Sequence, residues 1–414
     1  MNDSSSRFDR FVLIAILAGI VLGVFSGWLV GPPMASLKFL GDLFMNALKA
    51  VIVPLIAASM IVGITGLGDV RRLGRIGGVT ITYYALTTAI AVMIGLAVTN
   101  ALKPGLGAPI AGAAAPDLIH NREFSFIDLL VEMIPSSVFG CMADNQVLPL
   151  IVCSLIFGGV LTTLGEEGEP LIRFFAGLNA AMMKIVQLIM IYAPIGIFAL
   201  ISSTLGEKGG GSAALEEIAK IGKFVVTVVL GLSLHGFLVL PLILFLFAKR
   251  NPLVYSFNML GALTTAFSTD SSAATLPMTM KCAERNNRIS PQTSSFVLPL
   301  GATVNMDGTA LYEAAAALFI AEAYGISLSS LQQIVVFLTA TLASVGAAAI
   351  PHAGLVTMVM VLQAVGLPLE GIGLVFTVDW FLDRCRTVIN VWGDAVGAAV
   401  VDRFVPPKHE TPPN

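Results

Sequence analysis

Residues 379–394 read Asp-Trp-Phe-Leu-Asp-Arg-Cys-Arg-Thr-Val-Ile-Asn-Val-Trp-Gly-Asp, inside the long apolar stretch 371–404. Polar side chains recur there every three or four residues and therefore share one face of a helix; they are Asp379, Asp383, Arg386, Thr387, Asn390 and Asp394. Each Asp or Arg at the centre of a bilayer costs about 2.5–3.5 kcal/mol. We therefore expect this face to be buried in protein, where it binds ions and a solute. The alternative interpretation is a structural ladder of salt bridges between helices.

The composition of the whole chain is that of a polytopic membrane protein. Of its 414 residues 56% are hydrophobic and only 12% are charged, and the mean hydropathy is +0.88. A soluble domain carries about 25% charged residues, so a soluble enzyme of ordinary build and a disordered chain are excluded. The net charge of −3 leaves no basic surface for a nucleic acid. The four cysteines lack paired spacing and indicate neither a disulfide framework nor a metal cluster.

Six apolar segments that precede the last third of the chain are each long enough to cross a bilayer. They are 11–30, 44–67, 79–101, 147–164, 171–202 and 221–247, and Pro194 predicts a kink in the fifth. We predict no cleavable signal peptide. Basic residues flank the first, second and sixth segments, which places the N-terminus in the cytoplasm; they are Arg7, Arg10, Arg71, Arg72, Arg75, Lys249 and Arg250. Arg403 and Lys408 at the end of the last segment place the C-terminus there as well.

Two further segments do not fit a single crossing. Segment 253–284 has basic residues on both sides, and its polar centre ends at Pro277. Segment 331–367 would form a helix about 55 Å long, against a hydrocarbon core of about 30 Å, and its small-residue centre contains Pro351. We interpret both as re-entrant hairpins that enter from opposite faces, each followed by one span, 293–323 and 371–404. The predicted fold is therefore all-α and polytopic, with eight transmembrane helices, two opposed re-entrant helical hairpins and inverted repeats, as in secondary transporters.

The span 293–323 contains a second polar motif, Asn-Met-Asp-Gly-Thr, at 305–309. Asn, Asp and Gly weaken a helix, so we expect local unwinding that frees carbonyl oxygens. With the oxygens of Asn305, Asp307, Asn390 and Asp394 these carbonyls suit a hard cation. Residue chemistry alone allows either sodium or protonated carboxyl groups.

The remaining polar groups suggest the solute. Ser271 and Ser272 at the first hairpin tip, with free backbone N–H groups, suit one carboxylate, and the Arg386 fork suits a second. Asp383 suits an ammonium group, so the set describes an acidic amino acid. Glu313 is an isolated membrane carboxyl group. It is either a proton carrier or a protonated residue that is hydrogen-bonded to a neighbour.

Four motifs together resemble the dicarboxylate/amino acid:cation symporter family, the glutamate and aspartate transporters, with features of the animal excitatory amino acid transporters. They are Ser-Ser-Ala-Ala-Thr-Leu-Pro (271–277), Asn-Met-Asp-Gly-Thr-Ala-Leu-Tyr-Glu (305–313), Ile-Pro-His-Ala-Gly-Leu-Val-Thr-Met (350–358) and the stretch 379–394. The resemblance covers almost the whole chain and implies an elevator-type homotrimer. Helices 1–2 (11–75) and 4–5 (147–202) would form its scaffold, and 104–146 an external loop. Helix 3 (76–103) and residues 221–404 would form the transport domain.

The resemblance also assigns binding residues. Arg386 would bind the side-chain carboxylate of the substrate and Asp383 its amino group. The full substrate set is Ser271, Ser272, Thr309, Ile350, Pro351, Gly354, Asp383, Arg386, Thr387 and Asn390. The three implied sodium sets are Gly301, Asn305, Asn390 and Asp394; Thr303, Ser344, Val345 and Ala347; and Tyr84, Thr87, Thr88, Asn305 and Asp307.

The implied function is secondary active symport of L-glutamate or L-aspartate into the cell, driven by Na+, and not enzymatic catalysis. Glu313 matches the proton-carrying glutamate of the animal branch, which adds H+ and raises K+ counter-transport as a further possibility. Arg384 resembles the animal branch, whereas Asp270 stands where the better-known branches have arginine or serine, and we predict that the two residues pair. The compact fourth span and the lack of a large extracellular insertion predict a prokaryotic protein, located in the cell membrane.

Other functions fit the residues less well. A C4-dicarboxylate carrier would leave Asp383 without an amine, and a neutral amino acid carrier would have no use for Arg386. An intramembrane aspartyl protease is a remote alternative, because Gly-Leu-Gly-Asp at 66–69 has no partner Tyr-Asp motif. A dedicated ion channel needs no site for an amine and two carboxylates. The choice between glutamate and aspartate, the ion stoichiometry and the size of any anion conductance stay open.

Overall fold

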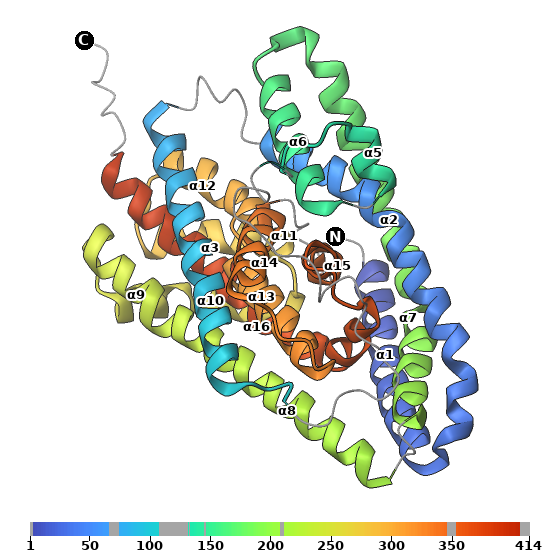
Figure 1. Cartoon of the computed structure of the whole chain (residues 1–414). Coiled ribbons are helices and arrows are strands. Elements are labelled where there is room, and N and C mark those ends of the chain that lie inside the picture. Colours follow the sequence, from blue (N-terminus) through green and yellow to red (C-terminus); the bar gives the residue numbers. More distant parts are fainter. Residues whose placement is uncertain are drawn as a thin grey trace, which may run out of the picture.

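The computed structural model describes residues 3–65, 74–106, 131, 133–144, 146–207, 211–345 and 353–405. All secondary structure in these residues is helical, and the helices form two groups that lie side by side (Figure 1). The predicted all-α class is thereby confirmed.

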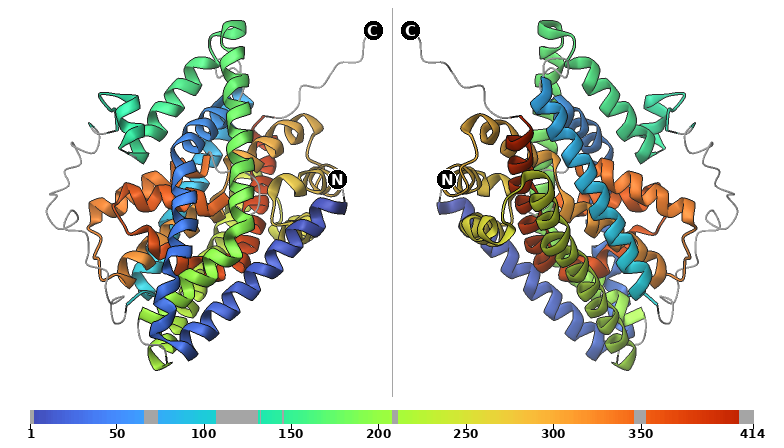
Figure 2. Two further views of the ribbon diagram at one scale, coloured as in Figure 1. Left: turned by 90° about the vertical axis from the view of Figure 1, so that its right-hand side faces the viewer. Right: turned by 90° about the vertical axis from the view of Figure 1, so that its left-hand side faces the viewer.

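The first group consists of α1 (Asp3–Val30), α2 (Lys38–Thr65) and α7 (Glu169–Glu207), with η1 (Pro32–Leu37) between α1 and α2. Both α1 and α2 pack along α7, and Figure 2 shows the three as one long layer. Glycines at four-residue spacing in α1 make the approach close. A Cβ on Gly19 would lie 2.5 Å from the carbonyl oxygen of Pro194, and one on Gly23 would lie 3.0 Å from that of Phe198. Such small-residue stripes let the backbones of membrane helices touch.

Helix α7 is bent where its proline was expected to bend it. Its segments Gly165–Val186 and Ile191–Ser203 meet at 54°. Pro194 lacks an N–H group, and its ring clashes with the carbonyl group one turn earlier. The predicted kink is therefore confirmed. The short helices α5 (Val138–Ala143) and α6 (Val147–Leu161) pack together, and α6 also lies against α2.

The second group surrounds α13 (Asp307–Ala323), in which every residue except Glu322 is buried. Around it lie α3 (Gly74–Leu102), α8 (Gly211–Leu234), α14 (Ser330–Val345), α15 (Ala353–Ala364) and α16 (Ile372–Phe404). The α3 and α13 backbones nearly touch, because a Cβ on Gly95 would lie 2.5 Å from the carbonyl oxygen of Leu311. The described parts of the four polar motifs lie in this group and in α11, which packs against α16.

Two of its elements are broken where the sequence predicted interruptions. α10 (Pro252–Thr269) ends at Asp270, whose φ of 54° is left-handed, and α11 (Ser272–Lys281) begins two residues later. α12 (Pro291–Val304) ends at Asn305, and α13 begins at Asp307. The expected unwinding at 305–309 is thus confined to Asn305 and Met306. The residues that join α14 to α15 lie outside the described part of the chain.

Helix α8 continues through two wider turns. The π-helical η3 (His235–Val239), α9 (Leu240–Ile243) and the π-helical η4 (Leu244–Ala248) follow without interruption. A further π-turn, η5 (Cys282–Asn286), follows α11, and the 3-10 turns η2 (Gly165–Glu167) and η6 (Leu369–Gly371) precede α7 and α16.

By length and composition, the described residues contain two apolar helices able to cross a membrane, Arg75–Leu102 and Ala219–Ala248, and the bent α7 adds a third. Four further predicted elements contain only shorter apolar helices: Ala18–Val30, Val53–Thr65, Pro149–Leu161 and Ser330–Ser344. The chain is therefore a helical membrane protein in outline, while the number of eight crossings stays a prediction. α16 is not among these apolar helices because one of its faces carries several charged residues.

Candidate functional site

The polar face of α16 is buried, as the sequence predicted. Exposure is 0% for Asp379 and Arg386 and 2% for Asp394, and Asp383, Thr387 and Asn390 are buried as well. The face lies against α10, α11, α12 and α13. The ion pairs that Arg386 makes are with Asp379 and Asp383 of α16 itself. A ladder between helices is therefore not what the arginine forms here.

Arg386 uses only part of its hydrogen-bonding capacity on the described residues. Its Nη2 donates to Asp379 Oδ1 at 2.9 Å and also bonds Asp383. Its guanidinium carbon lies 3.9 Å from the centroid of the Tyr312 ring, and the Tyr312 hydroxyl donates to the same Asp379 oxygen at 2.8 Å. Nε and Nη1 have no hydrogen-bond partner among the described residues. A buried guanidinium with two unused donors is a ready site for an anionic group.

Gly354 at the start of α15 borders these unused donors. A Cβ there would lie 2.8 Å from Arg386 Nη1. The absence of a side chain at Gly354 therefore lets the start of α15 approach the guanidinium closely. Two other residues of the predicted substrate set, Ile350 and Pro351, lie outside the described residues.

Asn390 joins α16 to the start of α13. Its Oδ1 accepts the Gly308 N–H at 2.8 Å, and its Nδ2 donates to the Thr309 hydroxyl at 3.2 Å. The two backbones touch here, because a Cβ on Gly308 would lie 2.6 Å from the Arg386 carbonyl oxygen. Thr309 and Asn390, both in the predicted substrate set, therefore bond each other next to the point where Gly308 packs against the Arg386 backbone.

The first hairpin tip meets the same face of α16. Ser271 caps α11 by accepting the Ala274 N–H at 3.2 Å, and Ser272 is buried beside it. The Thr387 hydroxyl donates to Asp270 Oδ1 at 3.3 Å. Thr387 therefore reaches the residue that directly precedes Ser271 and Ser272, and their place in one substrate pocket stays a prediction.

Arg384 also reaches this tip, but through the backbone. Its Nη1 donates to the carbonyl oxygens of Phe267 at 3.2 Å and Ser268 at 3.4 Å. These carbonyls belong to the last turn of α10 and have no helical partner, which makes them good acceptors for a cation. The pairing of Arg384 with the Asp270 carboxylate stays a prediction.

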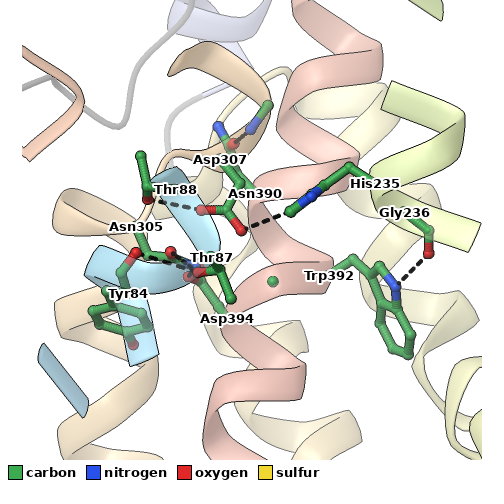
Figure 3. Close-up of polar contacts among 12 residues, drawn as sticks. Tyr84, Thr87, Thr88, His235, Gly236, Asn305, Asp307, Asn390, Trp392 and Asp394 are labelled. Atoms are coloured by element: carbon green, nitrogen blue, oxygen red, sulfur yellow. Dashed lines mark hydrogen bonds and ion pairs between the residues drawn. The ribbon is translucent and has the colours of Figure 1, made fainter. Parts of the chain in front are cut away.

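Two of the three predicted sodium sets converge on the break between α12 and α13 (Figure 3). Asn305 Nδ2 donates to Asp394 Oδ1 at 3.0 Å, and Asn305 Oδ1 accepts from the Thr87 hydroxyl at 3.4 Å. The Thr88 hydroxyl donates to Asp307 Oδ1 at 2.8 Å. Residues from α3, α13 and α16 therefore form one buried cluster around the unwound turn.

Gly301 and Tyr84 complete this cluster. A Cβ on Gly301 would lie 2.3 Å from Asp394 Oδ1 and 2.6 Å from the Tyr84 hydroxyl oxygen. Tyr84 donates to the carbonyl oxygen of Val297 at 2.7 Å. Only a glycine at 301 lets the carboxylate and the phenol approach the α12 backbone so closely.

The chemistry of the cluster is oxygen-rich and acidic. Two carboxyl groups, Asp307 and Asp394, are buried with hydroxyl, amide and carbonyl oxygens around them. Buried carboxylates need a counter-charge, and oxygen ligands suit hard cations. No group of three or more His, Cys, Asp or Glu side chains able to hold a metal occurs within the described ranges. The residues present therefore fit an alkali cation better than a transition metal.

The remaining predicted set is only partly described. Thr303 donates to the Leu300 carbonyl oxygen at 3.0 Å, and Ser344 donates to that of Thr341 at 2.9 Å. Val345 is the last residue of α14, and Ala347 lies outside the described residues. This set of sodium ligands stays a prediction.

Glu313 lies in the buried helix α13 with an exposure of 0%. Its Oε1 bonds the Thr357 hydroxyl of α15, and its Oε2 has no partner among the described residues. A protonated carboxyl group that is hydrogen-bonded to a neighbour fits this contact, and so does a proton carrier at rest.

The sequence interpretation missed three contacts of this site. His235 bonds Asp307, Tyr312 lies under Arg386, and Thr357 bonds Glu313. His235 had a signal, since it is an ionisable residue inside the apolar segment 221–247. Tyr312 and Thr357 had no comparable signal in the sequence, because their partners lie 44 or more residues away.

Comparison with known proteins gives similarities that extend over almost the whole chain. The family model described as the sodium:dicarboxylate symporter family matches residues 12–404. The human excitatory amino acid transporter 3 is 39% identical, covering 96% of this chain and 86% of its own length. A putative sodium-dependent excitatory amino acid transporter, glt-4, of Caenorhabditis elegans is 38% identical over 96% of this chain and 90% of its own.

Neutral carriers are similar as well. The human neutral amino acid transporter B(0) is 37% identical over 95% of this chain and 79% of its own length. The resemblance stated from the four motifs is confirmed, as is the expectation of a transporter and not an enzyme. With its buried α16 face and a match from residue 12 to 404, the chain belongs to the sodium:dicarboxylate symporter family.

Proposed function

We propose that this protein is a sodium-coupled symporter that carries L-glutamate or L-aspartate into the cell. The observation that carries the proposal is the buried Arg386 guanidinium, whose Nε and Nη1 have no hydrogen-bond partner among the described residues. Gly354 lies beside Nη1. Nε and Nη1 would bind the side-chain carboxylate of the substrate, and Asp383 would take its ammonium group.

The relatives include both acidic and neutral amino acid transporters, and Arg386 favours the acidic class. A neutral substrate side chain beside Arg386 would leave two buried donors without an acceptor. A buried unsatisfied donor costs about 1–3 kcal/mol, and more when the group is charged. Asp383 weighs against a C4-dicarboxylate, because such a substrate brings no amine and adds negative charge beside a carboxylate.

The proposed driving ions are Na+ and, through Glu313, H+. Asp307, Asp394 and Asn305 supply the oxygens for Na+ around the break after α12. If Glu313 carries the proton, E313Q should abolish the pH dependence of uptake and any dependence on K+ at the opposite face. Unchanged pH dependence in E313Q would remove Glu313 from the coupling.

We further propose the membrane arrangement that the family resemblance implies. α10–α11 and α14–α15 would be re-entrant hairpins, with both termini cytoplasmic in a prokaryotic cell membrane. α1, α2, α6 and α7 would form the scaffold of a homotrimer, and α3 with residues 221–404 a transport domain that moves as an elevator. Many large apolar side chains are exposed, among them Phe237 at 83% and Leu253 at 71%. Such surfaces require lipid or another subunit to cover them.

Uptake by protein reconstituted in liposomes tests the proposal. An inward Na+ gradient should drive accumulation of radiolabelled L-aspartate or L-glutamate, and R386C should abolish it. D383S should weaken amino acid uptake far more than any uptake of succinate. Accumulation that persists in R386C would overturn the assignment to acidic substrates, and accumulation without Na+ would overturn the coupling.

A further inference from the structure

His235 lies at the edge of the predicted sodium cluster, on an element to which no role has been given. It begins the π-helical turn η3 that follows α8, and its exposure is 0%. Its Nε2 lies 3.0 Å from Asp307 Oδ2, and its Nδ1 has no hydrogen-bond partner among the described residues. Figure 3 shows the imidazole reaching from its own helix to the carboxylate.

The π-turn holds the imidazole in place against α16. Trp392 Nε1 donates to the carbonyl oxygen of Gly236 at 3.0 Å. Gly236 also packs tightly against Ile389 of α16, because a Cβ on Gly236 would lie 2.4 Å from Ile389 Cδ1. π-turns inside helices occur frequently at functional sites. The backbone that carries His235 is therefore fixed by the same helix that supplies Asp394 and Asn390.

His235 and Thr88 together fix the orientation of the Asp307 carboxylate. Thr88 of α3 donates to Oδ1, and Nε2 of His235 lies 3.0 Å from Oδ2, which as a carboxylate oxygen accepts from an Nε2–H. A carboxylate has about four lone-pair directions, so both oxygens keep one for a cation. A buried carboxylate with a donor on each oxygen cannot turn without breaking a hydrogen bond.

We propose that His235 is a positioning residue for the sodium ion that binds at Asp307. The imidazole does not contact the ion, whose ligands are oxygens. It holds the carboxylate in the orientation that the ion requires, as hydrogen-bonded partners do around other metal ligands. This inference rests on the proposed sodium coupling and adds to it a residue that belongs to none of the predicted ion sets.

Three substitutions separate positioning from packing. H235Q places an amide N–H near the position of Nε2 and should keep the bond to Asp307. H235N is too short to reach, and H235L removes the donor. Loss of such a partner typically lowers metal affinity about 10–100-fold. We therefore expect H235N and H235L to need about 10–100-fold more Na+, while H235Q stays close to wild type.

The Na+ requirement is measured in two ways. The first is the Na+ concentration that half-maximally raises the melting temperature of purified, substrate-free protein. The second is the Na+ concentration for half-maximal uptake, with the KM for L-aspartate determined at saturating Na+. A positioning role shifts both Na+ values and leaves the KM and the maximal rate nearly unchanged. Y255F is the matched control, because Tyr255 is also buried and donates to the Ala395 carbonyl oxygen at 2.7 Å.

The outcomes distinguish the inference from the proposed function. Equal Na+ requirements in wild type, H235Q and H235N would overturn the role of His235 and leave the sodium coupling intact. A wild-type protein that Na+ neither stabilises nor drives would overturn the coupling, and the role of His235 with it. If H235L fails to fold, the comparison of H235Q with H235N decides alone.

Discussion

The interface of α1 with α7 and the cluster around α12 and α16 both depend on glycines. The atoms that pack against the glycines differ between the two regions. In α1, a Cβ on Gly19 would meet the backbone of Pro194. In α12, a Cβ on Gly301 would meet the carboxylate of Asp394 and the hydroxyl of Tyr84. The same small residue brings two backbones together in one region and brings ligand groups to the backbone in the other. Close packing therefore serves stability in the first region and chemistry in the second.

The substitution G301A should have the largest effect on ion binding. Its Cβ would have to displace Asp394 Oδ1 from 2.3 Å, which moves a carboxylate of the cluster. We expect the apparent Na+ affinity of transport to fall on the order of 100-fold, as when a metal site loses its geometry. The measurement is Na+-dependent L-aspartate uptake at equal amounts of reconstituted protein. Unaltered Na+ dependence would show that Gly301 and Asp394 are not part of an ion site.

The same change in the other region, G19A, should act on stability alone. A Cβ 2.5 Å from the Pro194 carbonyl oxygen forces α1 and α7 apart, and overpacking of this kind costs about 1–3 kcal/mol. We expect a lower melting temperature in detergent, with the half-maximal Na+ concentration of the surviving protein unchanged. A shift in Na+ affinity as large as that of G301A would erase the distinction between the two regions.

Y312F should have a moderate effect, confined to the substrate. The substitution removes the 2.8 Å hydrogen bond to Asp379 but keeps the ring under Arg386. A hydrogen bond to a charged group contributes about 1.5–3 kcal/mol, so we expect a KM for L-aspartate on the order of tenfold higher. Y255F, which loses a bond to the backbone carbonyl of Ala395, is the control, because neither residue belongs to the predicted substrate set. An equal rise of KM in both variants would make the effect one of general packing.

The smallest effect is expected from G222A in α8. A Cβ there would meet no atom within 4 Å. Replacement of glycine by alanine inside a helix stabilises it by about 0.5–1 kcal/mol. The melting temperature should stay level or rise slightly, and uptake should not change. A loss of stability like that of G19A would mean that the close contacts of α1 are not the cause of the effect there.

Local features of this fold could be predicted from the sequence because each has a local cause. The kink in α7 follows from Pro194, and the break after α12 follows from the motif that begins at Asn305. The buried face of α16 follows from its periodicity and from the cost of charges in lipid. The number of crossings could not be settled in the same way, since polar faces and breaks obscure the apolar segments.

Contacts between segments that are distant in the sequence could not be predicted from such local patterns. His235 and Asp307 are 72 positions apart, and Tyr312 and Asp379 are 67 apart. A lone histidine in an apolar segment signals a function but names no partner. The particular partners of Arg386, Asp379 and Asp383, were not predicted either, because periodicity places charged residues on one helix face without showing which of them pair.

Calorimetric titration of the purified protein with L-aspartate at a series of Na+ concentrations tests most directly whether the α16 face binds the solute and the cation as one unit. Coupled sites must influence each other reciprocally. We predict a Kd for L-aspartate that falls steeply as Na+ rises, and no measurable binding by R386C at any Na+ concentration. A Kd that is the same with and without Na+, or aspartate binding retained by R386C, would contradict the account.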